Sequence, residues 1–216
     1  MPTSRRYATG IDWLITEGAM QKRENACIHE HEVSRKMASV MEALEYVVVL
    51  ASSTDIELVA TIKEATKKAN KPLYINGGYM NRTMQIFTKR EAKMSKGHFE
   101  FHPKFVKLDD PKHPTMRKNG FVLITEVNQL PLVKDICNIL DLGEVLFFFS
   151  SWEGYYKDPA QVAINPRYKE FRDNFTNVID IHTSGYACQE TIQKSDRHRS
   201  IPKKPSLFTR KRTFPL

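Results

Sequence analysis

The amino-acid sequence predicts an α/β protein built on a mostly parallel, three-layer, Rossmann-like sheet. Three largely apolar runs, at residues 46–50, 121–125 and 145–149, indicate strands, and the first of them is typical of a strand covered on both faces. Segments with apolar residues at helical spacing lie between these runs, and short turns join the two kinds of segment. This alternation favours parallel strands connected by right-handed crossovers.

The chain opens with a short predicted strand over residues 11–18, which places Glu17 at a strand end. A helix is expected over residues 30–45, because apolar residues recur there at helical intervals. These residues are Val33, Met37, Val40, Met41 and Leu44. The helix leads into the buried strand at residues 46–50.

A βαβ unit follows. Thr54 and Glu57 have the spacing of a capping box, so the next helix is expected to start at Thr54 and to run to about residue 70. Residues 73–75 then form a strand that ends at the turn of residues 77–78.

The rest of the chain returns to the sheet after a long excursion. A helix is expected over residues 79–88, and residues 89–119 are charged and lack clear periodicity, with room for one short strand. Strands at 121–125 and 145–149 flank a helix over residues 130–140.

The final predicted helix starts near Pro166, a residue that suits a first helical turn. Its apolar face consists of Tyr168, Phe171 and Phe175. The last strand, residues 178–181, delivers the chain to His182.

Length and composition are those of a folded protein. With 216 residues, of which 41% are hydrophobic, the chain can bury a sizeable core. No apolar run approaches the roughly 18 residues that a membrane span needs. The three cysteines form no C-x-x-C pair, which favours a reducing, cytoplasmic location.

Positive charge is concentrated at the C-terminus. The formal net charge is +8, and residues 194–216 contain eight basic residues and one acidic residue. Such a segment can bind phosphates without regard to sequence. Its prolines and lack of periodicity are typical of a solvated, disordered end, and this is the favoured interpretation.

Small polar residues follow three of the predicted strands. Parallel strands bring their carboxyl ends to one edge of the sheet, where ligands commonly bind. Hydroxyls, a glycine and a helix N-terminus at that edge suit a phosphate group. The candidate RNA- or phosphate-binding residues are Ser52, Ser53, Thr54, Ser150, Ser151, His182, Ser184 and Gly185. Serine and threonine also cap helices for structural reasons alone, and this alternative stays open.

Aromatic residues follow the second of these clusters, at Trp152, Tyr155 and Tyr156. They could stack on nucleic-acid bases beside a phosphate site. Alternatively, they could pack against the excursion of residues 89–119.

Four segments together resemble the β-CASP branch of the metallo-β-lactamase nucleases, to which ribonuclease J belongs. These segments are residues 14–18, 47–55, 150–155 and 182–187, the last of which reads His-Thr-Ser-Gly-Tyr-Ala. The resemblance implies a division of the chain into a residual metallo-β-lactamase strand (1–20), a β-CASP-like domain (21–176), a return strand with the closing motif (177–193) and the basic tail (194–216).

The resemblance also implies roles for individual residues. Glu17 matches the acidic residue that precedes the β-CASP insertion and would be a vestigial catalytic group, whereas His182 and Ser184 match residues near the RNA phosphate. The family binds two zinc ions through histidines that lie upstream of Glu17. Here 16 residues precede Glu17, none of them histidine, and Tyr186 replaces a further family histidine.

The sequence therefore predicts the RNA- or phosphate-binding portion of a metallo-β-lactamase-fold ribonuclease, with no zinc of its own and no activity alone. RNA is the expected partner, and the chain is not expected to bind a membrane. Two alternatives remain: one half of a split zinc-dependent ribonuclease completed in trans by a metallo-β-lactamase half, or a nucleotide-binding or interaction module that shares the α/β fold.

Overall fold

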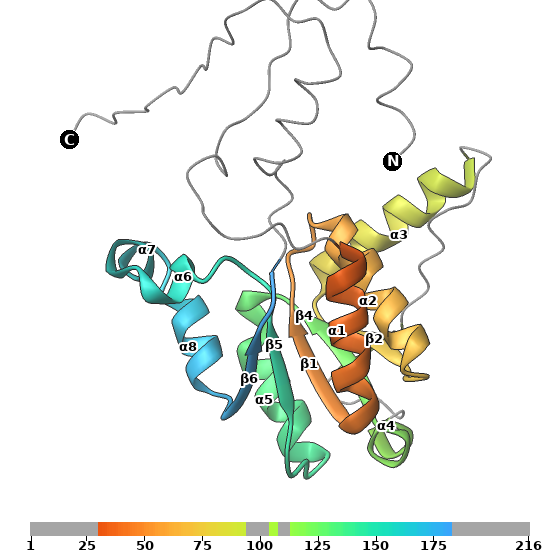
Figure 1. The fold of residues 1–216 in the computed structure, drawn as a ribbon. Helices are drawn as coiled ribbons and strands as arrows, with labels where there is room; N and C mark the ends of the chain where they lie inside the picture. Colours follow the sequence, from red (N-terminus) through yellow and green to blue (C-terminus); the bar gives the residue numbers. More distant parts are fainter. Residues whose placement is uncertain (1–29, 94–103, 108–112, 183–216) are drawn as a thin grey trace, which may run out of the picture. The chain divides into compact units, whose positions relative to one another are not determined.

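The computed structural model describes residues 30–93, 104–107 and 113–182, with side chains described up to residue 89 in the first of these ranges. Within them the chain forms a six-stranded sheet in the order β3-β2-β4-β1-β5-β6, and every pair of neighbouring strands is parallel (Figure 1). The predicted parallel α/β fold is confirmed. The predicted strand at residues 11–18 and the tail at residues 194–216 lie outside the described residues.

Helices and strands alternate along most of the chain. In chain order they are α1 (Glu30–Ala43), β1 (Tyr46–Leu50), α2 (Ile56–Lys68), β2 (Leu73–Ile75), α3 (Gly78–Lys93), β3 (Lys104–Phe105), α4 (His113–Asn119), β4 (Phe121–Thr125), the short 3-10 helix η1 (Val127–Gln129), α5 (Leu130–Ile139), β5 (Leu146–Phe149), α6 (Gly154–Lys157), α7 (Pro159–Ile164), α8 (Arg167–Asp173) and β6 (Asn177–Asp180).

The strand order determines which face each helix covers. From β1 the chain moves toward one edge of the sheet through β2 to β3, and it then moves back through β4 and β5 to β6. Because crossovers are right-handed, helices of the outward half lie on one face and helices of the return half lie on the other. Two separate hydrophobic cores confirm this arrangement: α1, α2 and α3 contribute to one, and α4, α5 and α8 contribute to the other.

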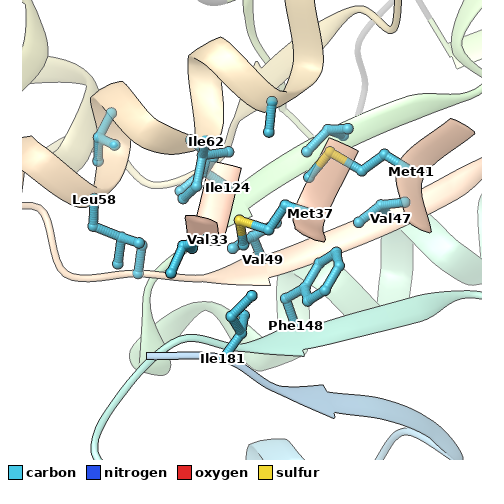
Figure 2. Close-up of a cluster of buried hydrophobic side chains, with 14 of the residues drawn as sticks. Val33, Met37, Met41, Val47, Val49, Leu58, Ile62, Ile124, Phe148 and Ile181 are labelled. Atoms are coloured by element: carbon cyan, nitrogen blue, oxygen red, sulfur yellow. The ribbon is translucent and has the colours of Figure 1, made fainter. Parts of the chain in front are cut away.

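The first core is mainly aliphatic and rich in methionine. Val33, Met37 and Met41 of α1 are fully buried against α2 and the sheet (Figure 2). The predicted stripe of α1 is thus confirmed at its centre, whereas Val40 and Leu44 are only partly buried at its margin.

The second core is rich in aromatic side chains. Phe147 of β5 stacks on Phe171, with ring centroids 5.1 Å apart, and on Phe175, at 4.6 Å. Offset stacking of this kind adds roughly 0.5–1.5 kcal/mol per pair beyond area burial. The apolar face expected after Pro166 therefore anchors α8 to the sheet.

Several boundaries differ from the sequence-based expectation. The helix expected from Thr54 begins at Ile56, because Asp55 is the N-cap residue and its carboxylate accepts a hydrogen bond from Leu58 N at 3.0 Å. The capping-box prediction at Thr54 was wrong by one residue: the aspartate, with its full charge, is the better acceptor for the helix N-terminus.

The excursion at residues 89–119 contains more helix than expected. It includes the end of α3, the short strand β3 and the helix α4. Only Met116 of α4 is a buried apolar residue, so the helix carries too little periodicity to be seen in the sequence. The buried His113 fixes its start, because the imidazole Nε2 lies 3.0 Å from the carbonyl oxygen of Lys107.

Candidate functional site

The carboxyl edge of the sheet has a topological switch point between β1 and β4. These two strands are neighbours, but the chain leaves β1 toward the β3 edge and leaves β4 toward the β6 edge. The connecting helices therefore diverge to opposite faces, and a crevice opens above the two strand ends. Ligands of open α/β sheets bind at such crevices.

A pocket of about 80 Å³ lies at this switch point. Strands β1, β4 and β5 contribute the residues that follow their carboxyl ends, and α8 contributes one aromatic ring. The lining residues are Leu50, Ala51, Ser52, Glu126, Val127, Ser151 and Tyr168. The pocket thus combines two serine hydroxyls, one carboxylate and one tyrosine ring that are brought together from four parts of the sequence.

Ser52, which lines the pocket, forms a small hydroxyl pair with Thr54, which is not among the lining residues. Their side-chain oxygens are 2.8 Å apart, and Thr54 N donates to Ser52 Oγ at 3.3 Å. The nearby N-terminus of α2 is already capped by the Asp55 carboxylate. Since this negative charge opposes a bound anion, we expect a ligand to contact the Ser52 hydroxyl rather than the helix terminus.

The other predicted hydroxyls divide between the pocket and the interior. Ser151 is half-buried and lines the pocket, whereas Ser53 and Ser150 are buried beneath the edge. Ser150 Oγ has no hydrogen-bond partner among the described residues. The structure therefore brings together Ser52 and Ser151, and it does not place Ser53 or Ser150 on the pocket surface.

His182 follows the end of β6, at the same edge of the sheet but two strands away from β1. The preceding residue continues the sheet, since Ile181 N donates to the carbonyl oxygen of Phe149 at 3.1 Å. His182 is half-buried and is not among the residues that line the pocket. Glu17, Ser184 and Gly185 lie outside the described residues.

Glu126 is a pocket residue that the sequence analysis missed. Its Oε2 atom is buried and has no hydrogen-bond partner among the described residues. The sequence does contain a feature that identifies it, because Glu126 is a polar residue directly after the apolar run of β4, just as Ser52 closely follows β1.

Asn76 was also missed. It follows β2 directly, it is fully buried, and neither its amide nitrogen nor its amide oxygen has a hydrogen-bond partner among the described residues. Buried polar atoms are normally paired, so unpaired ones in a native fold call for an explanation.

The predicted aromatic cluster adjoins the pocket through Tyr168. Tyr155 stacks on Tyr168 with ring centroids 4.6 Å apart, and Trp152 meets Tyr155 edge-on at 5.5 Å. Tyr156 packs edge-on against Phe149 of β5 at 4.9 Å. Burial raises the pKa of Tyr168. The described contacts of Tyr155 and Tyr156 are thus with α8 and β5.

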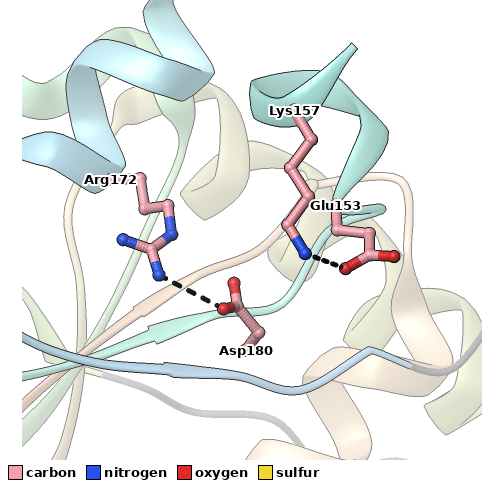
Figure 3. Close-up of polar contacts among 4 residues, drawn as sticks. All are labelled: Glu153, Lys157, Arg172 and Asp180. Atoms are coloured by element: carbon pink, nitrogen blue, oxygen red, sulfur yellow. Dashed lines mark hydrogen bonds and ion pairs between the residues drawn. The ribbon is translucent and has the colours of Figure 1, made fainter.

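Two ion pairs lie beside the ends of β5 and β6 (Figure 3). Lys157 Nζ donates to Glu153 at 2.6 Å, and this hydrogen bond raises the pKa of Lys157. Arg172 donates to Asp180 at 3.3 Å, and its guanidinium lies 4.9 Å from the centre of the Tyr156 ring. Both cations are therefore engaged by carboxylates of the chain itself.

Metal ligands are not grouped in the part of the chain that the structure describes: no three His, Cys, Asp or Glu side chains there are placed to hold one ion. Among the same residues, no helix is both long enough and apolar enough to cross a membrane.

No protein-family model matches the chain, and no curated protein matches it. The resemblance to the β-CASP branch therefore rests on the sequence motifs, and the function that it implies is a proposal.

Proposed function

We propose that this chain is the RNA-binding portion of a protein related to the β-CASP branch of the metallo-β-lactamase fold, and that it binds a ribose-phosphate strand along the carboxyl edge of its sheet. One observation carries the proposal: the pocket at the switch point, where Ser52 and Ser151 follow the neighbouring strands β1 and β5 and lie beside Tyr168 of α8.

The residue types that line the pocket favour a polar nucleic-acid strand over an apolar ligand. Serine hydroxyls can donate to phosphate or sugar oxygens and can also accept from sugar hydroxyls. A tyrosine ring offers an apolar face for a sugar or a base. Because Asp55 and Glu126 are acidic, we expect the phosphates to lie beside the hydroxyls of Ser52 and Ser151 and away from these two carboxylates.

The motif positions agree with this placement. Ser52 and Ser151 belong to segments that resemble the family, and His182 starts the segment with the most specific resemblance. All three follow strands that end at the same edge. An RNA strand bound across this edge would run from the carboxyl end of β4 toward the carboxyl end of β6.

Binding without cleavage is the proposed activity of the chain alone, because its sequence lacks the family's histidine-rich zinc motif. A split enzyme completed in trans is the competing proposal. RNA cleavage that requires both this chain and a separate metallo-β-lactamase half with zinc would establish it.

Fluorescence anisotropy of the full chain with a labelled single-stranded RNA of about 12 nucleotides tests the proposal. The Ser52→Ala/Ser151→Ala double variant removes two hydrogen-bonding groups worth about 1 kcal/mol each, so we expect roughly tenfold or greater loss of affinity.

Thr115→Ala is the matched control, because it removes an exposed hydroxyl in α4, which leads into the amino end of β4. We expect its affinity to equal that of the unmodified chain. Absence of RNA binding by the unmodified chain, or equal affinity of all three proteins, would overturn the proposal.

A further inference from the structure

Glu126 presents an unmet hydrogen-bond acceptor at the switch-point pocket. Its side chain lines the pocket, yet its Oε2 atom is buried and unpartnered among the described residues. Leaving a charged oxygen unsatisfied costs more than leaving a neutral one, so this arrangement is expensive unless a ligand supplies a donor.

A glycine lies next to the Glu126 carboxylate. Gly77 adopts a φ of +94°, and a Cβ atom at that position would lie 3.3 Å from Glu126 Oε2. Glycine therefore leaves room for the carboxylate. Gly78, the first residue of α3, follows, and the positive end of the α3 dipole favours a negative side chain here.

The charge of Glu126 restricts the chemistry of the donor. A phosphate oxygen is an acceptor with negative charge, so it is repelled. A hydroxyl donates to a carboxylate through a charge-assisted hydrogen bond. With Ser52, Ser151 and the Tyr168 ring in the same lining, the carboxylate, hydroxyls and ring together suit a sugar. Dinucleotide-binding α/β proteins likewise use an acidic side chain to hold a ribose hydroxyl.

We propose that Glu126 accepts a hydrogen bond from a ribose 2′-hydroxyl of the bound strand and thereby selects RNA over DNA. This inference rests on the proposed function, because it concerns the same pocket. The 2′-hydroxyl is the group by which a protein distinguishes the two nucleic acids at a given site.

The test compares a single-stranded RNA with a deoxyribose strand of the same base sequence, in which deoxyuridine replaces thymidine. A hydrogen bond to a charged group corresponds to about a 10- to 100-fold preference for RNA in the unmodified chain. In Glu126→Gln we expect RNA affinity to fall and DNA affinity to hold or rise, since a negative charge is removed, so that the preference largely disappears.

Glu42→Gln is the matched control. It removes the same charge from an exposed position in α1, the helix that leads into the amino end of β1. We expect it to leave the RNA-to-DNA ratio unchanged.

On the unmodified chain, a scan of the RNA with single 2′-deoxy substitutions finds the recognised hydroxyl without any protein variant. One or two positions should weaken binding to the unmodified chain, and the same positions should be silent with Glu126→Gln. Equal affinity of the unmodified chain for RNA and DNA, or an equal change of ratio in both glutamine variants, would overturn the role of Glu126 and leave the proposed function standing. No binding of either nucleic acid would overturn both.

Discussion

The two ends of the sheet satisfy their polar groups differently. At the amino end, the Tyr46 hydroxyl donates to the carbonyl oxygen of Arg117 at 2.9 Å, and Asn177 donates to Glu144 at 2.8 Å. At the carboxyl end, buried polar atoms of Asn76, Glu126 and Ser150 have no partner among the described residues.

This contrast indicates that the amino end of the sheet contributes mainly to stability and the carboxyl end mainly to binding. A folded chain gains from paired polar groups and loses from buried unpaired ones. The amino end is therefore built for stability, whereas the carboxyl end retains hydrogen-bonding capacity at a cost. Natural proteins keep such costs where a ligand makes use of them.

The largest expected effect on stability comes from Gly120→Ala at the amino end. Gly120 has a φ of +66°, and an added Cβ would lie 2.5 Å from the carbonyl oxygen of Glu45. We expect a loss of about 2–4 kcal/mol in the free energy of unfolding, measured by urea denaturation.

Gly77→Ala is the matched change at the carboxyl end. Its φ is also positive, but its closest neighbour is the end of the flexible Glu126 side chain. We expect a smaller loss, about 1–2 kcal/mol, together with weaker RNA binding because Glu126 is displaced. Unchanged RNA affinity in Gly77→Ala, or lowered affinity of folded Gly120→Ala, would contradict the division between the two ends.

A smaller effect is expected from deleting one hydroxyl at each end. Tyr46→Phe removes a paired hydroxyl and should destabilise the fold by about 0.5–1 kcal/mol. Ser150→Ala removes a buried, unpaired one and should be neutral or stabilising by up to about 1 kcal/mol. Thermal unfolding of both variants measures the sign of each change in stability. Destabilisation by Ser150→Ala would show that the Ser150 hydroxyl has a hydrogen-bond partner.

Much of the fold could be predicted because its strands are continuous apolar runs. The strand of residues 121–125, for example, is buried at every position, and its ends are those that the structure shows. The helix α4 could not be predicted, because one buried methionine and one buried histidine hold it in place. Its stability comes from tertiary contacts rather than from local pattern.

The candidate site was only half predictable. Ser52 and Ser151 were identified because hydroxyls after buried strands are visible in the sequence. Glu126 and Tyr168 join them only through the strand order, which makes β4 and β5 the two neighbours of β1, and through the packing of α8. Sequence alone does not determine which strand ends become neighbours.

The most direct test of the central claim, that the carboxyl edge binds RNA, is to map backbone amide NMR shifts of the full chain during an RNA titration. We expect saturable shifts at Ser52, Glu126 and Ser151, and unchanged signals at Glu45 and Gly120. Shifts confined to the amino end, or no shifts within the sheet and its connections, would contradict the claim.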